Sequence, residues 1–269
     1  DRWGAIDDFE GGTTGRRNLN LTFRSKGRNN SDFTAQAYFS RYDFKLFSNF
    51  TFFLEDPVNG DMIEQIDDRQ LFGFKSDYSF YHNVGSLLAR ATLGGSMRGD
   101  DTDVGLWKNT VREREYSLVD SRVLERNYSL WGREEIFLSP QWQLMLGLRA
   151  DYFTFNVEDR LIGLPAELPH ASGYAQNRIL SPKATLVYSP TRSLDLFFNA
   201  GTGFHSNDAR NAVIDQRVGE LQRSLTAQGR SRDEVLDALA ARNFDPGHLD
   251  AGTLPRAVGA EVGLRSRLS

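Results

Sequence analysis

The chain has no cysteine among its 269 residues and only three methionines. Without cysteine, neither disulfide bonds nor thiolate metal sites can form. The sequence also lacks any run of about 18 apolar residues, which excludes a membrane protein built from spanning helices. No basic segment followed by an apolar one opens the chain at Asp1. We therefore expect either that a signal peptide has been removed or that this is an internal piece of a longer protein.

An excess of charge of one sign is also missing. The 32 basic and 36 acidic residues give a net charge of −4 and are mixed along the chain. Nucleic-acid binding therefore has no electrostatic support. Aromatic residues, in contrast, reach 12%, with nineteen phenylalanines and nine tyrosines. Many large rings with little of the flexible methionine that fills helical cores favour β structure.

Apolar and polar residues alternate with period two over stretches much longer than ordinary strands. In "PQWQLMLGLRADYF", Trp142 and every second residue up to Tyr152 are apolar or aromatic, whereas Arg149 and Asp151 fall between them. Because neighbouring side chains of a strand point to opposite faces, such a segment is apolar on one side only. Residues 31–56 contain no glycine or proline and alternate in the same way. A strand of about 20 residues far exceeds the usual soluble length of about 5–6 and is typical of membrane barrels.

Short and long connections alternate along the chain. The short ones are rich in Gly, Pro, Asn and Ser and lie at residues 26–30, 82–86, 139–141 and 189–193. The long ones cover about residues 55–69, 98–123, 157–173 and 204–253. An up-and-down barrel of the outer membrane has this asymmetry, with tight periplasmic turns and long external loops. The alternation therefore favours a membrane barrel over a soluble all-β protein.

About nine strands are predicted, and an odd number is informative. We expect them near residues 17–25, 31–54, 69–81, 87–97, 124–138, 141–156, 174–188, 193–203 and 254–267. A bacterial single-chain barrel has an even number of strands, and bare strand edges are not tolerated in hydrocarbon. The fold class predicted for residues 1–269 is therefore all-β, a partial transmembrane antiparallel up-and-down β-barrel.

One long connection has helical spacing instead of alternation. Within residues 211–243, Ile214, Val218, Leu221 and Leu225 recur at helical intervals. Gly229 can end that helix, and Ser231 with Glu234 forms a capping-box pattern before a second one. We expect a helical insertion in one external loop, which either packs against neighbouring loops or forms a lid over an opening.

The ordered set of these segments resembles a known family. Its elements are "AYFSRYDFKLFSNFTFFLEDPVNGDMIEQIDDR", "LMLGLRADYFTFNV", "ILSPKATLVYSP", "LDLFFNAGTGFHSNDAR" and "LPRAVGAEVGLRSR". Together they are similar to the barrel of TonB-dependent outer-membrane receptors, with the helical insertion as the main departure. The resemblance implies a 22-stranded barrel plugged by an N-terminal domain, in the outer membrane of a Gram-negative bacterium. It also implies energy-dependent uptake of a ferric siderophore or other metal chelate, driven by TonB–ExbB–ExbD through the plug.

Two features of that family are not found in these residues. No plug or TonB-contacting segment precedes Asp1, and the end "GLRSRLS" lacks the usual terminal aromatic residue. We therefore expect this piece alone not to transport. No bound cofactor or resident metal is expected, and the partners are outer-membrane lipid and a small-molecule ligand. The alternatives are a passive porin and a barrel enzyme, of which we expect neither.

The stretch "GTGFHSNDAR" (201–210) concentrates His205, Asn207, Asp208 and Arg210 just after a predicted strand. Asn and Asp at a strand end commonly stabilise a turn, so the stretch is first a strand exit. A rim that contacts the ligand is the alternative. Catalysis is disfavoured, because Ser206 would point away from its neighbour His205 if the strand continues.

Other polar clusters allow a local and a functional interpretation. "RGDDTD" (98–103) resembles a calcium loop only in part and lacks the later ligands of an EF-hand, which favours a solvated loop. "EQIDDR" (64–69) is expected at a solvated rim. Arg112 and Arg114 alternate with glutamates, so they either pair locally or attract an anionic chelate at the mouth. Aromatic residues expected in the lipid-interface girdles are Trp131, Trp142 and Tyr152.

Overall fold

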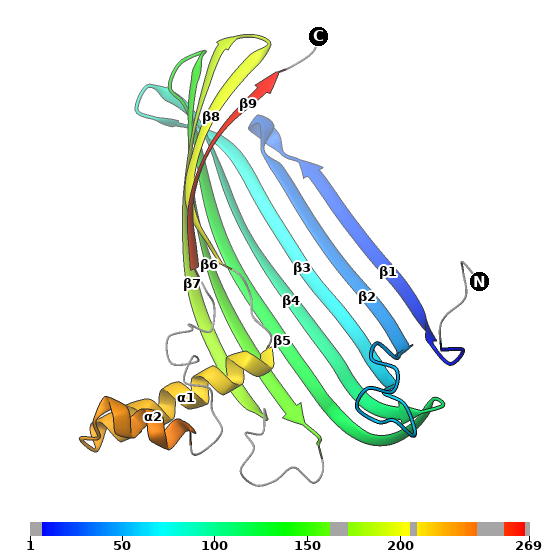
Figure 1. Cartoon of the computed structure of the whole chain (residues 1–269). Helices are drawn as coiled ribbons and strands as arrows, with labels where there is room; N and C mark the ends of the chain where they lie inside the picture. Colours follow the sequence, from blue (N-terminus) through cyan, green and yellow to red (C-terminus); the bar gives the residue numbers. More distant parts are fainter. Residues whose placement is uncertain (1–6, 162–171, 205–208, 241–255, 267–269) are drawn as a thin grey trace.

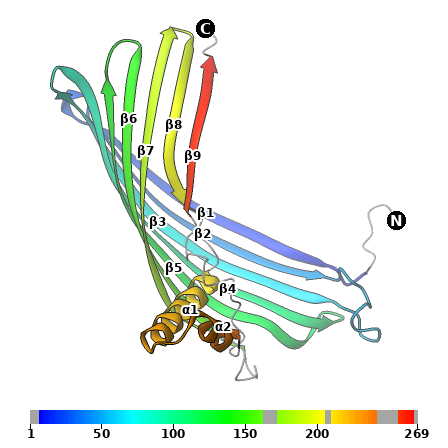
Figure 2. The same cartoon turned by 60° about the vertical axis from the view of Figure 1, so that its left-hand side comes forward.

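The computed structural model describes residues 7–161, 172–204, 209–240 and 256–266. Nine strands form one antiparallel sheet in chain order, so each strand pairs with its neighbours in sequence (Figure 1). The strands are β1 (Gly11–Lys26), β2 (Asp32–Ser48), β3 (Ile63–Val84), β4 (Leu87–Thr110), β5 (Glu113–Phe137), β6 (Trp142–Asp159), β7 (Gly173–Thr191), β8 (Leu194–Phe204) and β9 (Arg256–Ser266). The sheet curves into an open trough, with β1 and β9 at its two edges (Figure 2). The predicted partial up-and-down barrel is confirmed.

The two faces of the trough differ because the strands alternate. The convex face carries exposed apolar side chains, and Leu130 and Leu148 expose 72% and 49% of their surface. The residues that alternate with these apolar ones along each strand point to the concave face. Ser129 and Asp151 are examples, and both are polar and buried. A soluble sheet would bury its apolar face, whereas this one presents it outward.

The short turns and the long connections lie at opposite ends of the sheet. Residues 27–31, 85–86, 138–141 and 192–193 form short turns at one end. The opposite end carries the loop 49–62 and the segment that contains the helices (Figure 1). We call this second end the loop end. The predicted asymmetry is confirmed for these connections.

The long loop predicted over residues 98–123 is absent and is replaced by paired strand. β4 and β5 stay paired, with register shifts after Leu106 and after Lys108, down to a two-residue turn at Val111 and Arg112, where φ is 54° and 66°. Positive φ at both central residues is what a type I′ hairpin turn requires. The prediction failed because charged residues occupy both faces here, which removes the apolar alternation. Cross-strand pairs such as Arg122 with Asp101, at 2.8 Å, stabilise the ladder instead.

The predicted strand 31–54 ends early, at Ser48. The Asp61 carboxylate accepts hydrogen bonds from the backbone N–H groups of Leu54, Glu55 and Asp56 at 2.8–3.1 Å. These donors are therefore not available to a neighbouring strand, and residues 49–62 close into a compact loop. Phe52 within it has a positive φ of 58°, which a strand residue does not adopt.

Two helices, α1 (Ala209–Ala227) and α2 (Arg232–Ala240), lie in the segment predicted to be helical. Gly229 separates them with φ of 79°. The capping box is present, since Ser231 N–H donates to Glu234 Oε2 at 2.8 Å and Glu234 N–H to Ser231 Oγ at 3.3 Å.

The two helices are held by separate apolar contacts. Ala212 and Val213 of α1 pack on the concave face, against Phe153, Phe155 and Ala175 of β6 and β7. Val218 packs against Val235 and joins the two helices. Among the described residues, neither helix has the length and apolar character that crossing a membrane would demand.

Candidate functional site: the polar wall of the trough

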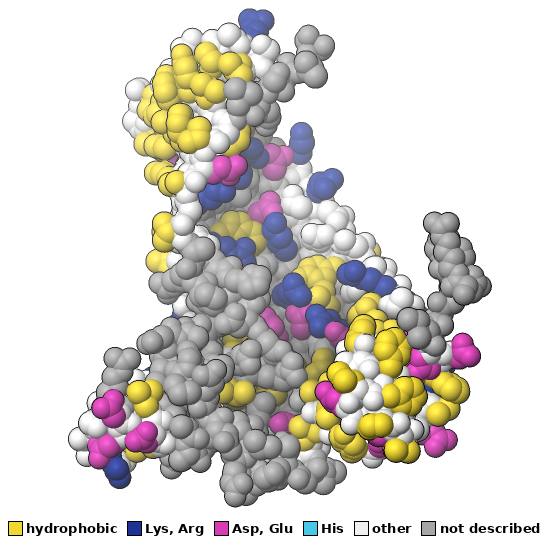
Figure 3. Space-filling view, viewed as in Figure 1, with side chains coloured by type: hydrophobic (Ala, Val, Ile, Leu, Met, Phe, Trp, Pro, Cys, Tyr) yellow, Lys and Arg dark blue, Asp and Glu magenta, His cyan; other side chains and the backbone are white. Residues whose placement is uncertain are grey.

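Charged side chains gather in the hollow of the concave face (Figure 3). The hollow has a volume of about 620 Å³ and lies over strands β2 to β6, with the first residue of α1 at its margin. We call its charged and amide-bearing lining the polar wall, which consists of Gln36, Arg69, Lys75, Arg98, Asp100, Glu125, Asn127, Arg149 and Asp151.

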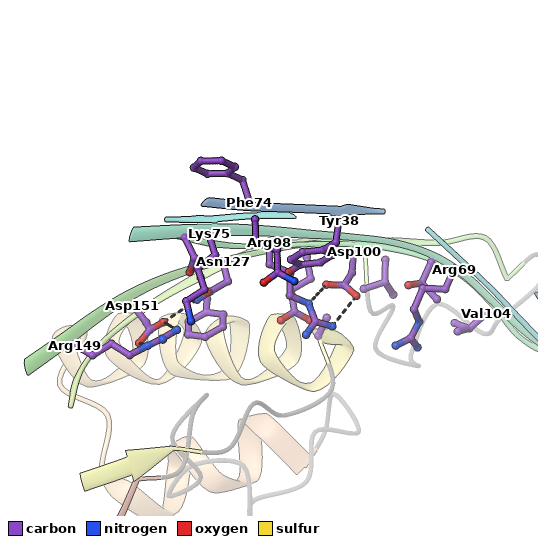
Figure 4. A pocket seen from close by; sticks show the side chains of 17 residues that line it. Tyr38, Arg69, Phe74, Lys75, Arg98, Asp100, Val104, Asn127, Arg149 and Asp151 are labelled. Atoms are coloured by element: carbon purple, nitrogen blue, oxygen red, sulfur yellow. Dashed lines mark hydrogen bonds and ion pairs between the residues drawn. The ribbon is translucent and has the colours of Figure 1, made fainter. Parts of the chain in front are cut away.

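Strand register places these residues on the same face. Lys75 of β3, Ser96 of β4, Ser129 of β5 and Asp151 of β6 lie opposite one another in a single row. Directly opposed residues of an antiparallel sheet project to the same side. Phe74, next to Lys75 in sequence, points to the other side of the strands (Figure 4). The polar wall is therefore a direct product of the period-two pattern.

Asp151 is the most enclosed charge of the wall. Its side chain is 0% exposed, and Arg149 binds it through two contacts of 2.8 Å. Ser129 Oγ donates to the same carboxylate at 2.6 Å and accepts a bond from Arg149 at 2.8 Å. A buried carboxylate needs such compensation, and a bidentate guanidinium provides it most effectively. The network holds both charged groups in one position (Figure 4).

The same pairing recurs along the other strands. Arg98 binds Asp100 of its own strand through Nε and Nη2 at 2.8 and 3.0 Å. Arg69 donates to Asp67 at 3.0 Å. Residues two apart on one strand point to the same face, so each pair neutralises itself. The wall is therefore polar but carries little net charge from these arginines.

Lys75 is paired differently, with an aromatic ring. Its Nζ lies 5.4 Å from the centroid of Trp131, and the guanidinium carbon of Arg149 lies 5.7 Å from the same ring. Both distances fit cation–π contacts. The ring lies over Gly94, where a Cβ atom would come within 2.3 Å of it. Trp131 therefore lies on the concave polar face, which corrects the expectation of a lipid-facing girdle residue; its neighbour Leu130 faces outward instead.

Trp142 and Tyr152 do lie on the convex face, at opposite ends of its apolar part. Trp142 stacks on Tyr188 at 4.3 Å between centroids, near the short turns, and Tyr152 stacks on Tyr128 at 6.4 Å, toward the loop end. Trp142 and Tyr152 are ten positions apart in β6, which corresponds to about 33 Å along a strand. With a tilt of about 40° this becomes a height of about 25 Å, that of the apolar band of outer-membrane barrels.

Arg112 and Arg114 lie at the loop end and are both engaged within the chain. Arg112 donates to the carbonyl oxygens of Phe9 and Glu10 at 2.7 and 2.9 Å. Arg114 binds Glu64 at 2.6 and 3.1 Å and stacks on Trp107 at 3.8 Å. Glu64, expected at a solvated rim, is instead buried between Arg114 and Lys45. Contact of either arginine with a ligand stays a prediction.

The stretch 201–210 leaves the sheet as expected, because β8 ends at Phe204 and α1 begins at Ala209. His205, Asn207 and Asp208 lie outside the described residues. Arg210 belongs to the first turn of α1, and its side chain is likewise outside the description. Their role at an external rim therefore remains a prediction.

Sequence reasoning missed the polar wall itself. A signal was present, since Arg-x-Asp occurs at 98–100 and again at 149–151, and both of these pairs are formed in the structure. The acidic stretch 98–103, considered as a loop, is part of β4. Within the described part of the chain, no group of three or more His, Asp or Glu side chains is arranged to hold a metal ion.

Comparisons with known proteins agree with this geometry. The family model "TonB dependent receptor-like, beta-barrel" matches residues 1–246. Similar solved structures include the ferric citrate transporter FecA in its unliganded form, with a TM-score of 0.68 and 13% identity over 81% of this chain. The siderophore receptor PiuA from Acinetobacter baumannii has a TM-score of 0.59 and 14% identity over 75%. The copper transporter OprC has a TM-score of 0.56 and 15% identity over 76%.

These matches cover 32–34% of the solved chains, so the present chain spans about a third of their length. At such low identity they establish a shared fold. A search of curated proteins found no significant match.

Proposed function

Because this chain belongs to the TonB-dependent receptor β-barrel family, we propose that it forms part of the wall of a receptor for a scarce nutrient. The family resides in the outer membrane of Gram-negative bacteria, and its members bind small-molecule ligands and interact with TonB. Its members and the structural neighbours are receptors and transporters, not enzymes. For this chain we propose energy-dependent uptake, coupled to TonB–ExbB–ExbD through a plug domain.

The observation that carries this proposal is the difference between the two faces of one sheet. The convex face has an apolar part between the Trp142–Tyr188 and Tyr128–Tyr152 stacks, and this part would be about 25 Å tall at the strand tilt that is usual in membrane barrels. The concave face carries the polar wall. Lipid contacts outside and a hydrated interior inside explain both. We propose that Trp142 and Tyr152 belong to the two interfacial girdles.

A metal chelate is the ligand class that the neighbours support. Ferric citrate, siderophore and copper appear in the descriptions of three of them. We propose the same class here, with a ferric siderophore as the first candidate. Arg112, Arg114, Arg210, His205, Asn207 and Asp208 remain the proposed rim contacts.

The helical segment 211–243 is proposed to be an insertion of an external loop. Its helix α1 is attached to the concave face through Val213 and Ala212 at the loop end. The first residue of α1, Ala209, lies at the margin of the hollow, so we propose that a ligand that enters the trough from this end passes beside α1. The insertion would therefore restrict the entrance.

Uptake under iron limitation tests the proposed function. A strain without the gene should lose accumulation of an iron-55-labelled chelate, chosen by screening several siderophores, and the gene should restore it. A protonophore should abolish the restored uptake, because the proton gradient powers TonB. A passive porin would instead conduct ions in planar bilayers and would be insensitive to the protonophore. Uptake that persists without energy would contradict the proposal.

A further inference from the structure

A second pocket lies at the loop end, between residues 7–9, the loop 49–62 and the β4–β5 turn. It has a volume of about 500 Å³, and all three segments contribute to its lining. Phe9, Phe53, Met62 and Val111 make part of this lining apolar. In Figure 3 this region is the group of apolar and acidic side chains at the lower right. The pocket is separate from the hollow of the polar wall, with which it shares no lining residue.

Hydrogen bonds between the three segments hold this pocket in shape. Asn49 donates from its backbone N–H to Glu10 Oε1 at 2.9 Å and from Nδ2 to Asp7 Oδ2 at 2.7 Å. On the other side, the backbone N–H of Asn109 in β4 donates to the carbonyl oxygen of Met62 at 2.8 Å. The segments therefore form one body, and a ligand would enter a pocket that is already shaped, which lowers the entropic cost of binding.

Asn49 has one polar atom that these bonds leave unsatisfied. Its side chain lines the pocket and the residue is only 3% exposed, yet its Oδ1 accepts no hydrogen bond from any residue that the structure describes. The bond from Nδ2 to Asp7 fixes which end of the amide carries the oxygen. Because a buried acceptor without a donor is costly, such atoms are rare in folded proteins. The lining of the pocket therefore calls for a hydrogen-bond donor at this point.

The charge of the pocket indicates which kind of donor fits. Asp7 and Asp8 both belong to the lining, and none of the described lining residues is Lys, Arg or His. The neighbouring Arg112 is engaged by the backbone carbonyl oxygens of Phe9 and Glu10. A donor that carries a positive charge is therefore favoured here over a neutral one, since it gains charge-assisted hydrogen bonds to the carboxylates.

From these features we propose that the pocket binds the ammonium group of an alkylamine. The ammonium donates to Asn49 Oδ1 and to the carboxylates of Asp7 and Asp8. Its alkyl chain lies against Phe9 and Phe53, whose rings also attract a cation. A metal ion fits less well, because much of the lining is apolar and the described residues contain no group of three or more acidic or histidine side chains arranged to hold one.

The inference deepens the proposed function and rests on it for the location of the pocket at the outer surface. It adds a feature of the ligand, namely a free amine on an aliphatic chain. A chelate whose charge is strongly negative would be repelled by Asp7 and Asp8, so the pocket favours chelates that are neutral or positively charged.

Binding of dansylcadaverine to the complete protein tests the pocket. This probe carries a fluorescent ring system and a primary amine on an alkyl chain, and its N-acetyl form keeps the chain but loses the charge. The protein is extracted from outer membranes in mild detergent, and binding is followed by the rise in dansyl fluorescence. The free amine should bind about tenfold more tightly than the acetylated form, because the charge-assisted hydrogen bonds are made only by the ammonium.

Two matched pairs of variants locate the site. Asp8→Asn should remove most of the advantage of the free amine. Glu55→Gln removes the same charge from a carboxylate outside the lining and should change the affinity by less than about twofold, since solvent screens a distant charge. Phe53→Ala should weaken amine binding about fivefold, whereas Phe50→Ala, outside the lining, should not. Heat-modifiable migration in gels confirms that each variant is folded.

Several results would overturn the inference. Equal affinity for the free and the acetylated probe would do so, and so would equal losses in the Asp8 and Glu55 variants. Ferrioxamine B, an iron chelate with a free amine, should displace the probe more strongly than its N-acetyl form, and equal displacement would refute the proposed ligand feature. Normal chelate uptake by a protein that binds no amine would refute this site alone. Amine binding that persists while energy-dependent uptake fails would refute the proposed function alone.

Discussion

At the scale of single residues, about half of the ion pairs described within this sheet join residues two positions apart on one strand, and the others join different strands. Arg98 with Asp100 and Arg149 with Asp151 are formed inside one strand, so no second strand is needed to place them. The contribution of such a pair to the stability of the protein depends on how deeply it is buried. An exposed pair contributes about 0–1 kcal/mol, whereas an enclosed carboxylate that loses its partner costs considerably more.

Replacement of Arg149 by leucine should therefore destabilise the protein. Asp151 would keep its bond to Ser129 but lose the bidentate cation, and we expect the free energy of unfolding to fall by about 2 kcal/mol. Arg41→Leu is the matched control, since its pair with Asp43 is exposed, and it should cost less than about 1 kcal/mol. Urea unfolding in lipid vesicles, followed by tryptophan fluorescence, measures both. Equal losses would show that the burial of Asp151 is irrelevant.

The loop 49–62 should respond to acid through Asp61. Burial raises the pKa of this carboxyl, but backbone N–H groups that donate to its charged form outweigh burial and hold the pKa at about 2, below the usual 3.8. A lowered pKa stabilises the loop fully above about pH 4. This stabilisation is lost as the pH falls toward 2.

Pepsin cleavage beside Phe52 and Phe53 measures that loss. Cleavage in the unmodified protein, normalised to a peptide substrate, should increase as the pH falls from 4 to 2. Asp61→Asn, which has no charge to lose, should be cleaved readily at both values. A loop in the unmodified protein that stays resistant at pH 2 would contradict the role of Asp61.

At the scale of elements, helix α1 is held to the sheet by a small apolar contact. Val213 is 1% exposed and packs among Phe153, Phe155 and Ala175. The luminal face of a barrel is usually polar, so this patch exists because a helix covers it. The strands themselves depend on ladder hydrogen bonds and should not require α1.

Val213→Asp should therefore release α1 without unfolding the sheet. An unpaired carboxylate in this contact would cost several kcal/mol, more than so small a contact contributes. Trypsin should then cleave α1 faster, while the heat-modifiable band of the barrel remains. Gln222→Ala, on an exposed part of α1, is the control, since it leaves every trypsin site in place and should not release the helix. Loss of the folded band in Val213→Asp would show that α1 is required for the sheet.

At the scale of the whole molecule, the solvent decides whether the apolar convex face is favourable. In water it would be an aggregation surface, because exposed apolar patches of this extent are rare in soluble proteins. In a bilayer it is the favourable exterior. A charged residue introduced at the centre of the apolar convex face distinguishes the two solvents.

Leu148→Arg should destabilise the protein by about 2–4 kcal/mol in lipid vesicles, as charges do at the midplane of a barrel. On a water-exposed face the same change would stay within about 0.5 kcal/mol. Met145→Arg, on the concave face of the same strand, should cost less because that face is hydrated. Urea unfolding in vesicles measures both variants. A neutral Leu148→Arg would contradict the proposed lipid contact.

The strands were predicted accurately only where one face is apolar and the other is polar. Strand β6 was predicted within three residues at its far end, since lipid-facing and water-facing residues alternate clearly between Trp142 and Tyr152. Beyond that band, both faces of β4 and β5 are polar, and residues 98–123 were wrongly predicted to form a loop. Trp131 was assigned to the wrong face because its residue type was weighed more than its position between Leu130 and Gly132.

The sequence by itself determined the period-two faces, the positions of the short turns and the capping of α2, because each depends on contacts between residues close together in the chain. Only the tertiary structure decided that Glu64 is enclosed by Arg114 and Lys45, that Trp131 lies between Lys75 and Arg149, and that α1 covers Phe155. These contacts join residues on different strands, or a helix and a strand. Strand register and the curvature of the sheet bring them together, and neither leaves a local pattern in the chain.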